Sequence, residues 1–479
     1  MPKKKTFQKK NYLNTPKIYD TYLVHADKFT HEPWTLTNLR IAQVLNFDEQ
    51  FITFQISNYS YKRNNSITLA MRTSQLIQDN YFSTKTITLP RDEVARLYND
   101  EAIYDVLRPY ANILYGGFVM HPPKPKPLYK GLKLDKNNQQ GIIYFKDDFG
   151  RVRILHGVNL SGTTKLPTSP RGATHLKNSL ANHRDVSFVG RPFPLDKADE
   201  HFRRLKAWGF DFLRFLVTWE AIEHAGPGEY DEDYLDYIEA IIDKASEYDI
   251  ILFIDFHQDV WSRFSGGSGA PGWTLEKVGF EINNFHQTGA ALIHQRYGDP
   301  FPKMAWATNY SKLATATMFT LFYAGNDFAP ETKIEGVPVQ DYLQQDYLAM
   351  LTMMAKRFKD KSNVIGYDLM NEPSKGFIGL ENVRKLEWVL KNGAMPTPYQ
   401  AMLLGAGFTQ EVQHWKFGMT GMHRQGRQVI NPNGLRAWQE GVEPIWKANG
   451  VWDTDSHGNP VLLRPEHFHM VDGKEVTFA

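Results

Sequence analysis

One carboxylate in this sequence stands where a proton donor would be expected. Glu372 follows the apolar run NVIGYDLMN and lies within Asn-Glu-Pro, residues 371–373. A carboxyl group at the end of a buried strand can stay protonated near neutral pH and protonate a leaving oxygen. The adjacent amide of Asn371 can bond a sugar hydroxyl. The pair predicts cleavage of a glycosidic bond, and the alternative for Glu372 is a helix cap or a surface carboxylate.

Polar side chains also accompany three other apolar runs, RVRILHGVNL, FDFLRFLVTW and DIILFIDFH. The first contains Asn159 and leads to Lys165, the second contains Arg214, and the third leads to His257 and Asp259. The carboxyl ends of parallel strands meet at one end of a barrel, where the catalytic groups gather. We therefore expect these side chains and Glu372 to lie close together.

The four apolar runs predict parallel strands covered on both faces, because they are dense in Ile, Leu, Val and Phe. Amphipathic segments separate them. Residues 196–209 read as a helix capped by Asp196 and ended by Gly209. A second helix, within residues 231–249, has one apolar stripe, and a third spans residues 341–360. Three β-helix-β repeats predict an α/β fold with a right-handed parallel sheet.

The chain divides by composition into four parts. Residues 1–20 form a basic tail that we expect to be disordered, and residues 21–120 alternate apolar and polar positions as half-buried strands do. That second part predicts a small β-rich accessory domain, with a faint likeness to a Tudor-like barrel. Residues 121–140, which include HPPKPKP, read as a linker. The catalytic part is expected over residues 141–479.

Composition narrows the partners and the compartment. Fifty-five Lys and Arg residues nearly balance 53 Asp and Glu residues, so no overall field favours nucleic acid, and a neutral small molecule is expected instead. Cysteine is absent, which excludes disulfides and thiolate sites. Without a secretory signal or an apolar span, the chain is expected to be intracellular, cytoplasmic or vacuolar. No motif indicates a metal, nucleotide or redox cofactor.

Longer sequence runs around these motifs indicate a family resemblance. Together with the strand-end residues, ILHGVNLSGTTKLP, FIDFHQDVWSRFSGGSGAPGW, MAWATNYSK and GVWDTDSHGNPVLLRPEHF resemble glycoside hydrolase family 5, in its fungal endoglycoceramidase-related branch. The resemblance covers roughly residues 141–479. It implies a (β/α)8 TIM barrel and an O-glycosyl hydrolase, a retaining β-glucosidase that acts on glucosylceramide or steryl glucoside. Such a protein would need no cofactor, and peripheral contact with a membrane would give it access to lipid.

The resemblance also implies roles for particular residues. Glu372 would be the acid/base, Asn371 would contact the sugar, and Arg214 would pair with the nucleophile. The remaining roles concern substrate: His257 would hold the sugar or the catalytic network, Lys165 and Asp259 would bond the terminal glucose, and Trp306 and Asn159 would line its subsite. Three alternatives stay open, namely a solvated loop lysine for Lys165, a core aromatic for Trp306 and a core histidine for His257.

The sequence departs from the family in its second carboxylate. A retaining glycosidase needs one about 5 to 5.5 Å from the acid/base. Seven glutamates follow Glu372, and none ends a convincing buried strand: Glu381, Glu387, Glu411, Glu440, Glu443, Glu466 and Glu475. Residues 374–479 read as helix fragments and loops. We therefore expect the nucleophile beyond residue 479 and a barrel that is incomplete at its C-terminus.

Two other functions fit parts of this pattern. A polysaccharide-directed family 5 hydrolase such as a cellulase would share Arg214, His257 and the Asn-Glu-Pro motif, but should lack the HQDVWSRFSGG and MAWATNY runs. A catalytically inactive carbohydrate- or lipid-binding protein would account for the missing nucleophile. The sequence leaves the aglycone and the oligomeric state open.

The segment between the third and fourth runs is expected to cover the barrel mouth. Residues 260–340 read as an elaborate loop region, because SGGSGAPGW lets the chain turn freely. Five aromatic side chains would offer apolar surface to a lipid: Trp273, Phe280, Phe285, Trp306 and Tyr310. The alternative is a lid that only packs on the barrel.

Overall fold

A computed structural model describes most of the chain after residue 150. The described ranges are residues 150–160, 163–173, 176, 179–180, 182–297 and 304–478, together with six strands that precede them. The chain forms two compact units, of which one comprises Met1–His156 with Glu200–Asp211 and the other Gly157–Asp199 with Phe212–Ala479. The predicted basic tail of residues 1–20 lies outside the described residues.

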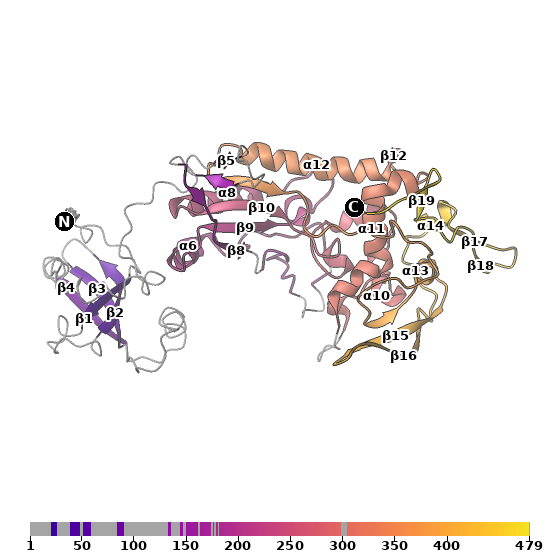
Figure 1. The fold of residues 1–479 in the computed structure, drawn as a ribbon, viewed down its shortest axis with the longest axis horizontal. Helices are drawn as coiled ribbons and strands as arrows, with labels where there is room; N and C mark the ends of the chain where they lie inside the picture. Colours follow the sequence, from indigo (N-terminus) through magenta and orange to yellow (C-terminus); the bar gives the residue numbers. More distant parts are fainter. Residues whose placement is uncertain are drawn as a thin grey trace. The chain divides into compact units, whose positions relative to one another are not determined.

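Four strands in the first unit follow the predicted alternation. They are β1 (Thr21–His25), β2 (Leu39–Phe47), β3 (Phe51–Asn58) and β4 (Thr84–Pro90), and each pairs antiparallel with the next. All four lie within the range expected to be β-rich (Figure 1). The rest of that range lies outside the described residues.

A second small sheet in this unit changes two sequence-based expectations. β5 (Lys133–Asp135) lies in the segment predicted to be a linker and pairs with β6 (Tyr144–Lys146). β6 pairs in turn with β7 (Val152–Arg153). The predicted first strand, residues 151–160, is thus divided: its start joins this antiparallel sheet, and its end, β8 (Gly157–Leu160), belongs to the parallel sheet.

The second unit is built on a parallel sheet of four strands. Its order is β13-β10-β9-β8, with β9 at Phe212–Val217, β10 at Ile251–Phe256 and β13 at Val364–Asp368. The apolar side chains of β9 and β10 supply much of the core; Leu213, Phe215, Leu252 and Ile254 are fully buried. The predicted parallel strands are confirmed, and their carboxyl ends lie at the same edge of the sheet.

Helices follow the strands as the apolar periodicity predicts. α8 (Glu232–Glu247) begins where the Asp231 side chain accepts the Tyr234 N–H, and its stripe of Leu235, Ile238, Ile242 and Ala245 is fully buried. α7 (Trp219–Glu223) directly follows β9. α12 (Val339–Phe358) precedes β13 and packs against α11 (Leu313–Phe328), as Figure 1 shows.

One predicted cap is wrong. Asp196 lies inside a 3-10 turn, η4 (Leu195–Lys197), which Pro194 precedes and α6 (Ala198–Ala207) follows. The fixed φ of proline suits it to a position just before a helix, so the cap is Pro194, two residues before the predicted position. The predicted end is confirmed, since Gly209 has a φ of +85°.

Residues 260–340 are more ordered than the predicted loop region. They contain η5 (Arg263–Ser265), α9 (Gly272–Lys277), η6 (Ile282–Asn284), α10 (Phe285–Thr288), η7 (His294–Arg296), η8 (Trp306–Ser311), α11, β11 (Lys333–Ile334) and β12 (Val337–Pro338). Trp273, Phe280 and Phe285 are fully buried. These three aromatics therefore stabilise the insertion and offer no free surface to a lipid.

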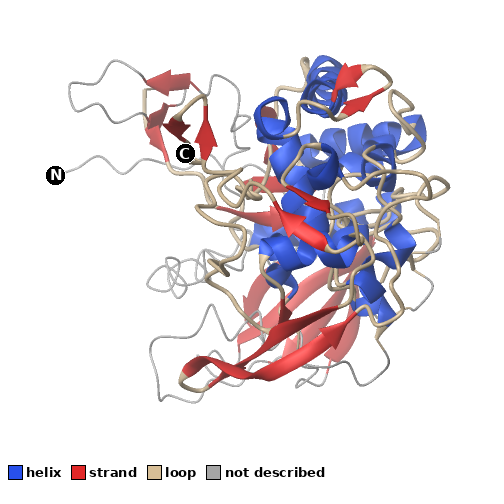
Figure 2. Ribbon diagram, turned by 90° about the vertical axis from the view of Figure 1, so that its right-hand side faces the viewer, coloured by secondary structure: helices blue, strands red, loops and turns tan. Residues whose placement is uncertain are grey.

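The C-terminal region contains more strand than its sequence predicts. β14 (Gly393–Met395), β15 (Gln410–Gly418) and β16 (Gly421–Ile430) form an antiparallel sheet, in which β15 and β16 make the long hairpin of Figures 1 and 2. Shorter elements complete it: α13 (Pro398–Gly405), α14 (Ile445–Ala448), β17 (Trp452–Thr454), β18 (Pro460–Leu462), β19 (Met470–Val471) and β20 (Lys474–Glu475). No helix in the described ranges is long and apolar enough to cross a membrane.

Candidate active site

Arg214 joins the ends of three parallel strands. Arg214 belongs to β9. Its Nη2 donates to Asp255 Oδ1 of β10 at 2.9 Å and to Asp368 Oδ2 of β13 at 2.9 Å. It also donates to Asn371 Oδ1 at 2.8 Å. Asp255 is fully buried, and a buried carboxylate is stable only when it is paired. The guanidinium therefore fixes both the sheet end and the amide that precedes Glu372.

A second chain of charges starts from the same buried aspartate. His257 Nδ1 lies 2.9 Å from Asp255 Oδ2, and its Nε2 lies 3.2 Å from Asp259 Oδ2. Lys165 Nζ donates to Asp259 Oδ2 at 2.6 Å, and Ser268 Oγ donates to it at 3.1 Å. The imidazole is thus held between two carboxylates, and three contacts converge on one oxygen of Asp259.

Opposing effects set the charges in this chain. Burial disfavours the ionised imidazole of His257, but the hydrogen bonds to Asp255 and Asp259 outweigh burial and raise its pKa. Burial likewise disfavours the Asp259 carboxylate, yet the bonds from His257 and Lys165 lower its pKa to about 2. Asp259 is therefore an ionised acceptor at neutral pH, with the Lys165 ammonium group and the His257 imidazole on two sides.

Glu372 is held through its backbone. Its φ is +45°, a left-handed conformation that few residues other than glycine adopt. Gln258 Nε2 donates to the carbonyl oxygens of Asn371, at 2.7 Å, and of Glu372, at 2.9 Å. Asn371 Nδ2 donates to the Gln258 carbonyl at 2.9 Å. These reciprocal bonds stabilise a strained turn, and the exposed Glu372 side chain extends from it at the open end of the sheet.

The turn after β10 is equally constrained. Val260 and Trp261 have φ values of +48° and +77°, which are uncommon for a β-branched and a bulky residue. The Trp261 N–H donates to Gln258 Oε1 at 2.9 Å. Asp259 pairs with Ser268 in an isolated bridge, and a Cβ at Gly267 would lie 1.9 Å from the Asp259 carbonyl oxygen. Gly267 is therefore required for close approach of the backbone, whereas the sequence suggested only freedom to turn.

Comparisons with known proteins relate part of this chain to a family of glycoside hydrolases. A family model described as Cellulase (glycosyl hydrolase family 5) matches residues 175–392. Residues 175–392 belong to glycosyl hydrolase family 5. The match spans β9, β10 and β13, and it includes Arg214, His257, Asp259 and Glu372.

Individual relatives extend the likeness along the chain. A glucosylceramidase of Rhizopus delemar is 44% identical over 349 residues, which are 70% of this chain and 50% of the relative. An ergosteryl-beta-glucosidase of Saccharomyces cerevisiae is 39% identical over 375 residues, which are 68% of this chain and 49% of the relative. The chain spans about half the length of the curated relatives it matches.

A solved structure gives the fold class. Cryptococcus neoformans sterylglucosidase 1 superposes with a TM-score of 0.66 at 39% identity, over 70% of this chain and 52% of that protein. The parallel sheet therefore belongs to a (β/α)8 TIM-barrel fold, of which β8, β9, β10 and β13 are four parallel strands.

The structure brings most of the predicted site residues of the family 5 domain together. Arg214, His257, Asp259, Lys165 and Asn371 are connected by the hydrogen bonds described above. Asn159 lies in β8, directly opposite Arg214 in the strand register. The partners of Arg214 are two aspartates and an amide, where the resemblance implied a nucleophile.

Sequence reasoning missed the role of Gln258, and it predicted Tyr310 only as apolar surface for a lipid. Burial, with a smaller contribution from the nearby carboxylates of Glu372 and Asp259, raises the pKa of Tyr310 to about 12. Tyr310 follows Trp306 by one helical turn in η8, and the two ring centroids lie 6.4 Å apart. Trp306 is 42% exposed, so it is not a core aromatic. The W-x-x-N-Y spacing is the signal that could have paired the two rings.

The later glutamates lie outside the parallel sheet. All seven between residues 374 and 478 have exposed side chains, and no residue of that range belongs to the parallel sheet. Glu411, on β15, forms an ion pair with Arg427 of the same hairpin at 2.8 Å. Within residues 374–478, no glutamate ends a strand beside Glu372.

Proposed function

We propose that this chain supplies the acid/base and glucose-binding half of a retaining β-glucosidase that cleaves glucose from glucolipids, either glucosylceramide or steryl glucoside. The observation that carries the proposal is the placement of Glu372 at the carboxyl end of β13, on a turn held by Gln258 and Asn371. A proton donor must be held within reach of the leaving oxygen. The names of the relatives, glucosylceramidase and ergosteryl-beta-glucosidase, support the substrate class.

Each of these residues has a separate role in glycoside cleavage. Glu372 gives its proton to the glycosidic oxygen as the bond from that oxygen to the anomeric carbon breaks, and the bonding electrons leave with the aglycone alcohol. Asn371 hydrogen-bonds the 2-hydroxyl, a contact that strengthens in the transition state. Asp259 and Lys165 hold the hydroxyls of the terminal glucose, and Trp306 gives the ring an apolar face. A carboxylate on the opposite face must then capture the anomeric carbon.

A second candidate function is sugar or lipid binding without turnover. The fold of residues 374–478 favours it, because none of the seven glutamates in that range lies on a strand of the parallel sheet. The two functions differ in whether Glu372 can transfer a proton to a bound glucoside. Reaction with an external nucleophile therefore distinguishes the two functions.

Azide can replace the missing carboxylate in this test. The 479-residue chain is incubated with a β-glucoside of a poor leaving group, with and without azide, and the glucosyl azide is identified by NMR. We expect slow, azide-dependent formation of the α-anomer, because a single displacement inverts the configuration. Glu372→Gln should abolish it. Glucose binding in a chain that forms no azide product would support the binding function and contradict the proposal.

The choice of substrate is tested in the same assay. Glucosylceramide and ergosteryl glucoside in mixed micelles are compared with cellotetraose, with azide present in each case. Faster reaction of cellotetraose would favour a polysaccharide-directed hydrolase over the glucolipid assignment. A β-glucosyl azide would indicate two successive displacements, and thus a nucleophile within the chain.

Peripheral contact with a membrane belongs to the same proposal, because glucolipids reside in bilayers. The tip of the β15–β16 hairpin carries Phe417, which is 64% exposed, and Met419, which is fully exposed. Lys416 and Arg424 flank them with exposed side chains. Apolar side chains beside cations suit an anionic lipid surface. This hairpin would bring the domain to its substrate.

A further inference from the structure

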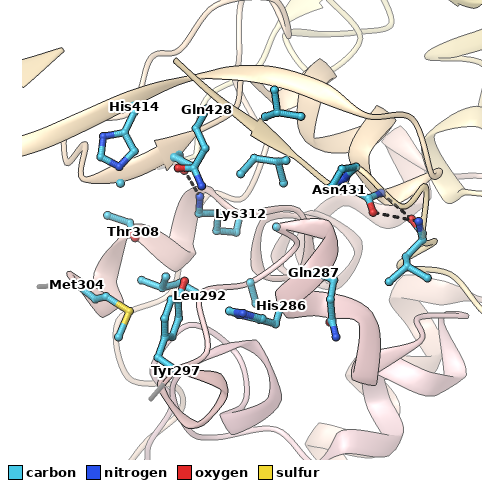
Figure 3. A pocket seen from close by; sticks show the side chains of 18 of the residues that line it. His286, Gln287, Leu292, Tyr297, Met304, Thr308, Lys312, His414, Gln428 and Asn431 are labelled. Atoms are coloured by element: carbon cyan, nitrogen blue, oxygen red, sulfur yellow. Dashed lines mark hydrogen bonds between the residues drawn. The ribbon is translucent and has the colours of Figure 1, made fainter. Parts of the chain in front are cut away.

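A cavity of about 540 Å³ lies beside the β15–β16 hairpin and holds a buried lysine (Figure 3). We call it the Lys312 pocket; its wall includes His286, Tyr297, Thr308, Lys312, His414 and Gln428. Its volume falls within the range of small-molecule sites. None of the residues that hold Glu372 lines it, so its ligand is independent of the proposed glucosidase activity.

The buried position of Lys312 is unfavourable for the stability of the folded protein. Its side chain is 6% exposed, and its Nζ donates to the carbonyl oxygen of Ala394. No carboxylate within the described ranges pairs with it, and burial lowers its pKa to about 8. The group therefore remains mostly charged at neutral pH. A buried ammonium group with a neutral acceptor as its partner destabilises the fold.

The position of Lys312 in the chain adds to this cost. Lys312 is the N-cap of α11, where serine, threonine, aspartate or asparagine is preferred. The N-terminus of a 16-residue helix carries partial positive charge, so a cation there is unfavourable and an anion is favourable. Burial and the helix dipole thus act in the same direction, and an anion beside Nζ would relieve both.

The remaining wall of the pocket is suited to such an anion. Among its described lining residues there is no aspartate or glutamate, while two imidazoles and several amides supply hydrogen-bond donors. Leu292, Met304 and Val429 give the wall an apolar part. With one buried ammonium group, the charge to be matched is a single negative one.

We propose that the Lys312 pocket binds a small molecule with one carboxylate and an apolar body, and that the carboxylate forms an ion pair with Lys312 Nζ. A carboxylate in this place would satisfy the ammonium group and oppose the positive end of α11. The hydrocarbon part would lie against Leu292, Met304 and Val429. Thr308 joins this wall from η8, the same 3-10 turn that carries Tyr310 toward Glu372.

Calorimetric titration of the full chain with octanoate tests the proposal, with 1-octanol as the uncharged comparison. We expect saturable binding of one octanoate and much weaker binding of octanol. Lys312→Met keeps the side-chain length and removes the charge, so it should weaken octanoate binding by about thirtyfold or more, as for loss of one partner of a buried ion pair. Lys359→Met is the matched control, since it removes an exposed charge at the C-terminal end of α12, a helix that contributes no residue to the pocket wall.

A second measurement uses the unaltered protein, so that it does not depend on the folding of a variant. Reductive methylation with formaldehyde and cyanoborohydride is followed by mass spectrometry, and octanoate should protect Lys312 and leave Lys359 reactive. Equal affinity for octanoate and octanol, retention of octanoate by Lys312→Met, or absence of protection would each overturn the proposal. Displacement of octanoate by inorganic phosphate at lower concentration would also do so, since it would indicate a site for a compact dianion.

Discussion

Arg214 and Asn371 lie 157 positions apart in the sequence and are joined by a hydrogen bond of 2.8 Å. The guanidinium that neutralises Asp255 and Asp368 thereby also orients the amide that precedes Glu372. The stability of the sheet end and the placement of the proton donor depend on one side chain. Substitution of Arg214 should therefore affect both.

Arg214→Met should lower the free energy of unfolding by about 3 to 5 kcal/mol, because it leaves the buried Asp255 carboxylate without its cation. Arg214→Lys should recover part of this loss, since an ammonium group cannot match the planar geometry of the guanidinium. Urea unfolding measures both. Arg427→Met, which breaks an exposed pair with Glu411, is the control and should change stability by less than about 0.5 kcal/mol. Equal losses in the two methionine variants would contradict the central role of Arg214.

Glu372→Gly should make the protein more stable while it abolishes azide-dependent cleavage. Glycine adopts a φ of +45° without the steric cost that glutamate incurs, a difference of about 1 kcal/mol. Glu372→Gln has the same loss of proton transfer but retains the strain, so it serves as the reference. Thermal unfolding of the two variants gives the comparison. A lower melting temperature for the glycine variant would show that the turn is not strained.

Asp259→Asn should lower the pKa of His257, because the imidazole loses one of the two carboxylates that favour its charged form. NMR titration of the His257 ring measures the change. Asp243→Asn, which removes an exposed carboxylate paired with Lys361, should leave that titration unaltered.

The same substitution has a pH-dependent effect on stability. The raised pKa of His257 stabilises the folded protein below pH 6.5, and this contribution is lost as the pH rises through the folded pKa of His257. The lowered pKa of Asp259 stabilises the folded protein above pH 3.8, and this contribution is lost as the pH falls toward 2. The decrease in the free energy of unfolding caused by Asp259→Asn should therefore be greatest between pH 3.8 and 6.5. A constant cost across that range and above it would argue against the His257–Asp259 coupling.

Lys312→Met should stabilise the free protein. The folded pKa of about 8 lies below the unfolded value of 10.5, so the unfolded chain binds more protons between these values and stability rises with pH across that window. The variant lacks this dependence. The melting temperature of Lys312→Met should exceed that of the unaltered protein most below pH 8, and the difference should decrease toward pH 10.5. A lower melting temperature of the variant at neutral pH would show that the Lys312 charge is already compensated in the free protein.

The hairpin tip should bind anionic vesicles. Flotation with phosphatidylserine-containing vesicles should recover the protein, and Phe417→Ser with Met419→Ser should reduce that recovery several-fold, because the insertion of apolar side chains is lost. Leu348→Ser removes an exposed leucine from α12 and serves as the control. Unchanged recovery of the double variant would remove the hairpin from the proposed membrane contact.

The sequence was sufficient for the parallel strands and for the residues at their ends. Apolar runs bounded by turns mark β9, β10 and β13 clearly; His257 directly follows β10, and Glu372 lies four residues after the end of β13. β8 was harder to delimit, because β7 continues the same apolar run into a different sheet.

Contacts between distant segments could not be predicted in this way. Gln258 supports Glu372 from another strand end, 114 positions away, and no local pattern indicates that bond. Trp273, Phe280 and Phe285 read as exposed lid aromatics because the surrounding sequence is rich in glycine. Their burial depends on residues distant in the sequence: Trp273 packs on Trp219, with ring centroids 5.5 Å apart, and Phe280 stacks on Trp438 at 4.2 Å.

The close packing at Gly267 determines how the site would appear in a survey of tolerated substitutions. Even alanine there would bring its Cβ to within 1.9 Å of the Asp259 carbonyl oxygen, and a Cβ at Gly269 would lie 2.5 Å from that of Gln258. Saturation mutagenesis scored by activity would therefore rank these two glycines with Glu372, although neither carries a functional group. Intolerance to substitution in this loop reports the space available to the backbone, and only a separate assay of folding would distinguish it from a role in chemistry.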